Sequence, residues 1–142
     1  MNTSQLSPYL NFNGTCREAM EFYQSVLGGK LTVNTFGSMS PETPADYKDK
    51  VMHADLQNGT LSFMASDCAP GREATVGNNI HMSIAGTDQT TLTKYFNDLS
   101  AGGSVDMPLE KQMWGDLFGM LTDKFGVHWM ININVSTSTN QQ

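Results

Sequence analysis

Histidine offers the most versatile chemistry in this sequence, which contains three of these residues. An imidazole changes charge near neutral pH and can act as an acid, a base or a metal ligand. His53 stands two residues before Asp55 in the run VMHADLQ, so the two could form a carboxylate–imidazole pair that shuttles protons. His81 stands in the run NNIHMSIAG. His53 and His81 are therefore the candidate catalytic residues.

The third histidine, His128, lies in the run TDKFGVHWMININ, whose second half alternates in polarity. Such alternation is typical of a strand with two different faces. One face carries Trp129, Ile131 and Ile133, and the other carries His128, Met130, Asn132 and Asn134. A strand of this kind usually lines something, and its polar face could hold a metal, hold an organic ligand or face water.

The elements that must position these residues follow a repeated plan. Residues 9–13 alternate like a strand, and a helix is predicted over 15–27, opened by a capping box from Thr15 to Glu18 and ended by Gly28-Gly29. Three strand-like runs follow, at 30–37, 51–57 and 60–67. Asn58-Gly59 joins the last two runs and is a strong hairpin signal.

The same order then recurs. Residues 78–86 read as a strand, and Asp88 or Thr87 caps a helix that ends at Gly102-Gly103. Strands are expected at 104–112, 115–122 and 127–134. The sequence therefore predicts one α+β domain of two βαβββ modules, about 7–67 and about 78–134, with a flexible tail at 135–142.

One helix covers only one face of a four-stranded sheet, so two such modules can form a curved sheet around a cavity. Strand alternation predicts which side chains point into that cavity. They are Tyr9, Asn11, Ser62, Met64, Ser66, His81, Ser83, His128, Met130 and Asn132. The strand at 51–57 allows two readings, with either His53 and Asp55 or Met52, Ala54 and Leu56 facing the cavity.

Five motifs occur along the duplicated plan in this order: PYLNF, AMEFYQSVLGGKL, HADL, SD at 66–67 and TDKFGVHWMIN. Together they resemble the vicinal oxygen chelate superfamily, which includes glyoxalase I, extradiol dioxygenases and bleomycin resistance proteins. Within the superfamily the chain is most similar to the PhnB-like branch, over residues 7 to about 134. The resemblance implies the glyoxalase/bleomycin resistance fold.

The resemblance also bears on metal binding. In metal-using members a D-P-x-G turn is followed four residues later by a glutamate ligand, and here Met130 takes that place. His81 matches a ligand histidine, but the other two ligand places fall at Ser7 or Pro8 and at Met64. A thioether is a poor ligand for the divalent ions these enzymes use. We therefore expect no metal and no other cofactor.

The expected function is binding of a small organic molecule in the cavity. The residues predicted to contact it are Tyr9, Ser62, Met64, Ser66, His81, Trp114, Phe118, Met130 and Asn132. The alternative is a lyase, isomerase or dioxygenase-type enzyme of the same superfamily. It would use an atypical divalent metal at His81 with Asp67 or Asp116, or acid–base chemistry at His53 or His81. Related proteins often carry a methyltransferase label, but the sequence has no G-x-G-x-x-G loop for a nucleoside cofactor.

The composition narrows the choice of partners and compartment. A formal charge of −6 disfavours nucleic acid as a partner, and no apolar run is long enough to cross a membrane. The N-terminus has no signal-peptide pattern, and the two cysteines have no ligand spacing, which indicates a cytoplasmic protein. We also expect a homodimer, with candidate contacts at Phe36, Met39, Val105 and Met107.

Overall fold

A computed structural model describes residues 4–135 of the 142-residue chain. The chain divides after Thr75 into two compact units, module one and module two. Both are βαβββ modules, which confirms the predicted fold class. Most of the predicted tail, residues 136–142, lies outside the described residues. No helix within 4–135 is both long and apolar enough to span a membrane.

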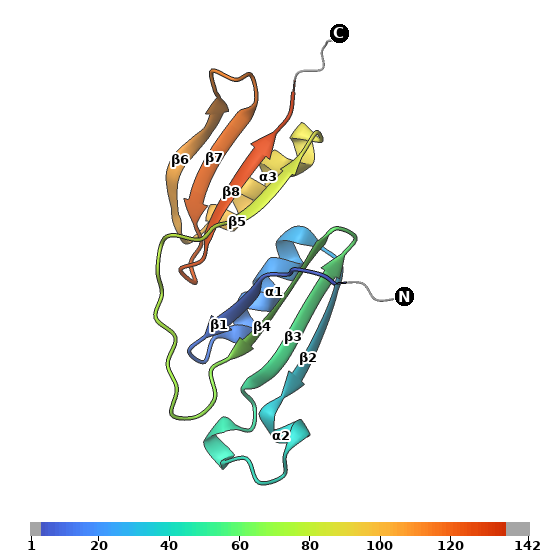
Figure 1. The fold of residues 1–142 in the computed structure, drawn as a ribbon, viewed down its shortest axis with the longest axis vertical. Helices are drawn as coiled ribbons and strands as arrows, with labels where there is room; N and C mark the ends of the chain where they lie inside the picture. Colours follow the sequence, from blue (N-terminus) through green and yellow to red (C-terminus); the bar gives the residue numbers. More distant parts are fainter. Residues whose placement is uncertain (1–3, 136–142) are drawn as a thin grey trace. The chain divides into compact units, whose positions relative to one another are not determined.

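Module one is a four-stranded sheet with one long helix (Figure 1). In sheet order the strands are β1, β4, β3 and β2; β1 runs parallel to β4, and the other neighbours are antiparallel. The elements are β1 Tyr9–Phe12, α1 Cys16–Leu27, β2 Lys30–Thr35, α2 Phe36–Met39, the 3₁₀ turn η1 Ala45–Tyr47, β3 Val51–Asn58 and β4 Leu61–Asp67.

The apolar stripe of α1 packs on one face of this sheet. Its buried members are Cys16, Ala19, Met20, Tyr23 and Leu27, and the helix contacts β2, β3 and β4. The helix stops where the sequence predicted, because Gly28 and Gly29 adopt positive φ angles of +77° and +93°. A Cβ on Gly29 would come within 2.3 Å of the Gln57 carbonyl oxygen, so no larger residue fits there.

The start of α1 differs from the prediction. Thr15 makes no side-chain capping bond. The buried carboxylate of Asp67, at the end of β4, takes its place: Oδ1 accepts bonds of 2.9 Å from the backbone N–H groups of Gly14 and Cys16. Oδ2 accepts a third bond of 2.9 Å from Val51 N–H at the start of β3. The capping-box prediction was wrong because local sequence spacing cannot reveal a cap that lies 51 residues away.

The same carboxylate affects the neighbouring thiol. Burial, and secondly the negative charge of Asp67, raise the pKa of Cys16 to about 12. The thiol is therefore neutral and packs as a small apolar side chain.

Module two repeats the plan with strand order β5, β8, β7 and β6 (Figure 1). Its elements are β5 Met82–Gly86, α3 Gln89–Ser100, β6 Ser104–Lys111, β7 Leu117–Thr122 and β8 His128–Ile133. Asp88 caps α3 as predicted, its Oδ1 accepting a 3.1 Å bond from Thr91 N–H. That backbone bond is also the main reason why the pKa of the Asp88 carboxyl is lowered.

The first strand of module two is shorter than predicted. The sequence indicated a strand from 78, but β5 begins at Met82. Its parallel partner β8 begins only at His128, and the first residue pair is Met82 with Trp129. In the same register residues 78–80 would stand opposite residues 125–127, which precede β8, so these three residues have no β8 residue to pair with. The other predicted strands agree with the structure to within about two residues.

Alternation separates the two faces of each sheet as predicted. Under α1 lie Phe63 and Ala65 of β4, and under α3 lie Ile84, Trp129, Ile131 and Ile133, all buried. The opposite face, called here the open face, carries Tyr9, Asn11, Ser62, Met64 and Ser66 in module one and Ser83, Phe118, Met120, Thr122, His128, Met130 and Asn132 in module two.

The two readings of the third strand are now resolved. Ala54 and Leu56 are buried, at 0% and 1% exposure, whereas His53 and Asp55 are half-buried on the open face. Val51 is also fully buried, although strict alternation from Ala54 would place it on the open face. The register between β2 and β3 shifts at this point, and the extra residue of such a bulge reverses the alternation.

The three bonds to Asp67 lead to a stability prediction. Asp67→Asn removes the charge and replaces one acceptor oxygen with an NH₂ group that faces a backbone donor. We expect it to lower the free energy of unfolding by about 2–4 kcal/mol, measured by urea denaturation. Asp46→Asn, at an exposed position of η1, is the matched control and should change little. Equal effects of the two substitutions would contradict the role given to Asp67.

The two faces of β8 provide a second prediction. Trp129 is 1% exposed, and its Nε1–H donates a 2.8 Å bond to Asp123 Oδ2, whereas Met130 lies half-buried on the open face. Trp129→Ala should cost about 3–5 kcal/mol, and Met130→Ala about 1 kcal/mol or less. Thermal and urea denaturation measure both. A loss from Met130→Ala as large as that from Trp129→Ala would show that Met130 belongs to the core.

Candidate ligand-binding site

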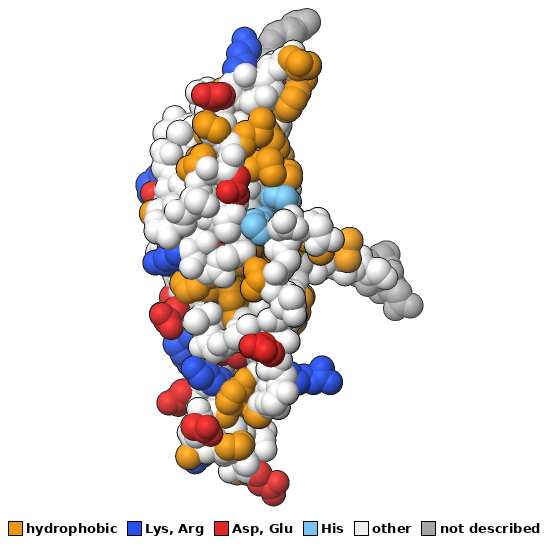
Figure 2. Space-filling model, turned by 90° about the vertical axis from the view of Figure 1, so that its left-hand side faces the viewer, with side chains coloured by type: hydrophobic (Ala, Val, Ile, Leu, Met, Phe, Trp, Pro, Cys, Tyr) orange, Lys and Arg blue, Asp and Glu red, His pale blue; other side chains and the backbone are white. Residues whose placement is uncertain are grey.

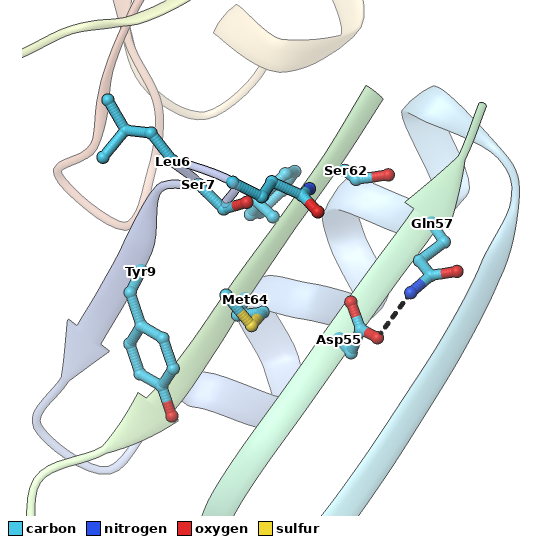
Figure 3. A pocket seen from close by; sticks show the side chains of 9 residues that line it. Leu6, Ser7, Tyr9, Asp55, Gln57, Ser62 and Met64 are labelled. Carbon is cyan, nitrogen blue, oxygen red and sulfur yellow. Dashed lines mark hydrogen bonds between the residues drawn. The ribbon is translucent and has the colours of Figure 1, made fainter. Parts of the chain in front are cut away.

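A row of side chains crosses the open face of module one. Strand register places Tyr9 of β1 beside Met64 of β4, and Met64 beside Asp55 of β3. Figure 3 shows Met64 between the tyrosine ring and the carboxylate. These three side chains border a cavity of about 590 Å³. All lining residues belong to module one: Gln5, Leu6, Ser7, Tyr9, Asp55, Gln57, Ser62, Phe63 and Met64.

His53 lies on the same face and contacts Tyr9. The Tyr9 hydroxyl is 3.1 Å from His53 Nδ1, and the ring centroids are 5.8 Å apart. The expected pair between His53 and Asp55 is not formed, because Asp55 Oδ2 instead accepts a 2.8 Å bond from Gln57 Nε2–H. No hydrogen bond joins His53 to Asp55 in the described part of the chain. The structure thus offers a tyrosine–histidine pair in place of the predicted carboxylate–imidazole pair.

A second hollow, of about 420 Å³, lies at the other end of the same open face. Asn11, Ser66 and Met52 line it together with residues 67–69 and 72–74. Ser66 Oγ–H donates a 3.3 Å bond to Asn11 Oδ1. Ser66 therefore lines this second hollow and not the first, so the predicted ligand residues of module one divide between two places.

A third hollow, of about 300 Å³, contains the basic side chains that the first lacks. Lys50 and Arg72 line it, with Tyr47 and Cys68. Lys50 Nζ donates a 3.1 Å bond to the Gly14 carbonyl oxygen. Burial, followed by the negative charge of Asp67, raises the pKa of the Tyr47 hydroxyl. Of the three hollows, only this one has both a lysine and an arginine in its lining.

The open face of module two gathers two histidines. The His81 and His128 rings lie 5.5 Å apart. His128 Nδ1 is 2.9 Å from Thr122 Oγ1, and His128 Nε2 is 3.0 Å from the Gly77 carbonyl oxygen. The Thr122 hydroxyl donates its own hydrogen to Asp106 Oδ2, 2.7 Å away. Both ring nitrogens of His128 are thus occupied by hydrogen bonds. In Figure 2 imidazole groups reach the surface beside hydrophobic side chains.

The predicted residues of β7 and β8 lie along the same face. Register places Met130 beside Ser83 and Met120, and Asn132 beside Phe118. Asn132 Nδ2–H donates a 3.0 Å bond to Asp116 Oδ2. Trp114, 58% exposed in the turn before β7, meets Phe118 edge to face at 6.0 Å. This surface combines sulfur, aromatic and amide groups.

No group of three or more His, Cys, Asp or Glu side chains within residues 4–135 is placed to hold a metal ion. The carboxylates considered as partners for His81 have other contacts: Asp67 accepts three backbone bonds, and Asp116 accepts from Asn132. Met64 and Met130 occupy equivalent places, each three residues before the end of its strand. These donors do not suit a hard divalent ion.

The predicted site residues therefore fall into two groups. Tyr9, Ser62 and Met64 meet in module one, and His81, Phe118, Met130 and Asn132 share the open face of module two. Convergence of the two groups on one pocket stays a prediction.

Sequence reasoning left Asp55 undecided and missed Gln57 and Ser7 as lining residues. Ser7 stands two residues before Tyr9, and alternate residues of an extended chain share a face, so strand alternation could have identified Ser7 as a lining residue.

Comparison with known proteins agrees with this architecture. Residues 4–132 match the family described as 3-demethylubiquinone-9 3-methyltransferase. Protein YjdN of Escherichia coli is 31% identical over 140 residues, covering 90% of this chain and 94% of YjdN. The crystal structure of protein PA1353 from Pseudomonas aeruginosa is 44% identical, with a TM-score of 0.85, and the match covers 94% of this chain and 100% of that one.

More distant structures share the fold. A PhnB protein from Bacillus cereus is 23% identical, with a TM-score of 0.73, over 92% of this chain and 99% of that one. A glyoxalase/bleomycin resistance protein/dioxygenase family enzyme from Burkholderia phytofirmans is 16% identical, with a TM-score of 0.60. The match covers 89% of this chain and 97% of that one. The match over residues 4–132, the two βαβββ modules and the motif order together place this chain in the PhnB-like family of the vicinal oxygen chelate superfamily.

Proposed function

We propose that this PhnB-like protein binds a small organic molecule on the open face of module one, without a conventional divalent metal. The observation that carries the proposal is the hollow of about 590 Å³ beside Tyr9, Met64 and Ser62. Its volume is in the usual range for small-molecule sites. Tyr9 and Met64 offer apolar contact, whereas Ser62 and Gln57 offer directed hydrogen bonds, which is the mixture that small-molecule sites use.

Methyl transfer is not part of the proposal, although the family description names it. A nucleoside cofactor usually binds at a glycine-rich turn between a strand and a helix. In this chain the corresponding connections read NGT before α1 and TD before α3, and the Gly-Gly pairs follow the helices. The residues therefore support the superfamily's binding fold more than the chemistry in the family description.

One observation favours a second candidate, metal-free acid–base catalysis. The Tyr9 hydroxyl and His53 Nδ1, 3.1 Å apart, could exchange a proton at the edge of the cavity. Tyr9→Phe and His53→Gln should each abolish such catalysis, because each removes one of the two groups that exchange the proton. Ligand binding without catalysis does not depend on proton exchange between these two groups. His81 is a less suitable base than His53, because its ring lies beside the ring of His128, whereas His53 lies beside a hydroxyl group that could exchange a proton with it.

The proposal extends to assembly and location. Met39 on α2 and Val105 on β6 are 56% and 48% exposed, and with Phe36 and Met107 they remain the candidate contacts of a homodimer. Sedimentation at micromolar concentration tests this. A reducing, cytoplasmic compartment suits Cys16 and Cys68, which are both free thiols.

Ligand binding can be tested by screening small molecules with NMR detection. Hits should perturb backbone signals around Tyr9, Ser62 and Met64. Met64→Ala should weaken a hit about tenfold, because the apolar contact of one side chain is worth about 1.5 kcal/mol. Met113→Ala, at a methionine that is 99% exposed, is the matched control and should leave affinity unchanged. Hits that perturb only Phe118 and Asn132 would move the site to module two, and an absence of hits would contradict the proposal.

Metal content can be measured by elemental analysis of protein purified without chelator. We expect less than about one tenth of a divalent ion per chain, because methionine stands where a carboxylate ligand is needed. Met130→Glu supplies that oxygen on the face that carries His81 and should raise metal affinity. Stoichiometric zinc, nickel or manganese that is lost in His81→Ala would contradict the metal-free proposal.

A further inference from the structure

The cavity beside Tyr9 and Met64 has an unbalanced charge. Asp55 is the one carboxylate among its lining residues, and no lysine or arginine lines it. In Figure 3 the Asp55 side chain lies on the open face, beside that of Gln57. An exposed carboxylate is ordinary, but one that lines a hollow without a lysine or arginine in its lining selects among ligands by charge.

No ion pair within residues 4–135 includes this carboxylate. Its hydrogen-bond partner is the neutral amide of Gln57, and the ion pair that the described residues contain joins Lys94 to Asp98 in module two. Lys30 is the cation nearest by register, because it stands opposite Gln57 on the edge strand β2. No ion pair connects Lys30 with Asp55. The charge of Asp55 is thus available to a ligand.

The surrounding side chains suit a cation that carries an apolar group. Tyr9 and Asp55 stand two strands apart in one row, roughly 10 Å at the usual strand spacing, with Met64 between them. An aromatic or aliphatic group can lie on the thioether and the tyrosine ring while an amine reaches the carboxylate. The aromatic face of Tyr9 also attracts cations. Ser62 and Gln57 add hydrogen-bond acceptors for the remaining N–H groups.

We propose that the ligand of this cavity is an organic cation, an amine joined to a small apolar or aromatic group, with Asp55 as its counter-ion. The inference rests on the function proposed above and specifies its ligand class. The contrast inside module one supports it, since two cations, Lys50 and Arg72, and one carboxylate, Glu73, line a separate hollow whose charge balance is opposite in sign. The formal charge of −6 also favours the approach of cations.

Three probes of nearly equal shape separate charge from shape: 2-phenylethylamine, 2-phenylethanol and 3-phenylpropanoate. Titration of the full chain, followed by two-dimensional NMR at low ionic strength, measures each affinity at the signals of Tyr9, Asp55, Ser62 and Met64. We expect the amine to bind about tenfold or more tightly than the alcohol, and the carboxylate to bind weakest. Added salt should weaken the amine and leave the alcohol nearly unchanged.

Variants then assign the preference to one residue. Asp55→Asn keeps the shape and should reduce amine affinity to that of the alcohol, whereas Asp55→Glu should keep a preference for the amine. Asp46→Asn removes an equal charge at an exposed position of η1 and should retain the full preference. Should Asp55→Asn fold poorly, the amine-induced shifts of the Asp55 and Gln57 signals in the unaltered protein, compared with those that the alcohol induces, locate the charge contact.

The outcomes separate this inference from the function on which it rests. Equal binding of the three probes, tighter binding of the carboxylate, or a preference for the amine that persists in Asp55→Asn would overturn the cation inference and leave the binding cavity in place. Absence of any shift at the cavity signals with all three probes would overturn both.

Discussion

Buried carboxylates that accept several N–H groups hold each module together. Asp67 joins three segments of module one, because its two oxygens bind the start of α1 and the start of β3 from the end of β4. A charge that is 3% exposed would be costly without such partners. In module two Asp123, also 3% exposed, accepts from the N–H groups of Phe125 and Val127 and from the Trp129 indole. The D-x-x-G turn thus has a structural role in this chain.

These anchors explain how function is separated from stability. Each fixes a helix start or a strand start on the covered side of its sheet, where apolar packing with α1 or α3 supplies the core. The open face contributes less to that core, so its side chains are free to differ. Module one carries there a tyrosine–histidine contact and the carboxylate of Asp55, which forms no ion pair with the described residues. Module two carries two histidines, a threonine and amide groups.

The same freedom explains why fold and chemistry diverge in this superfamily. Strand register keeps Met64 and Met130 in equivalent places, on the open faces of β4 and β8. At such a place a carboxylate would support metal chemistry, whereas a thioether supports contact with an organic molecule. Fold alone therefore does not fix the reaction, and function must be inferred from the individual side chains.

The sequence by itself determined the two modules, the C-terminal ends of the two long helices and the two faces of most strands. The period-two and period-3.6 patterns and the Gly-Gly and Asn-Gly signals that specify these features act over a few residues. Only the tertiary structure decided what depends on partners far along the chain. The cap of α1 comes from Asp67 and not Thr15, since the bond spans 51 residues. Likewise the predicted strand does not extend back to residue 78, because parallel register would place residues 78–80 opposite 125–127, before the start of β8. His53 and Asp55 lie on the open face because Ala54 and Leu56 pack under α1, and alternation within one strand cannot show which face a helix will cover. The bulge that buries Val51 likewise depends on how β3 pairs with β2.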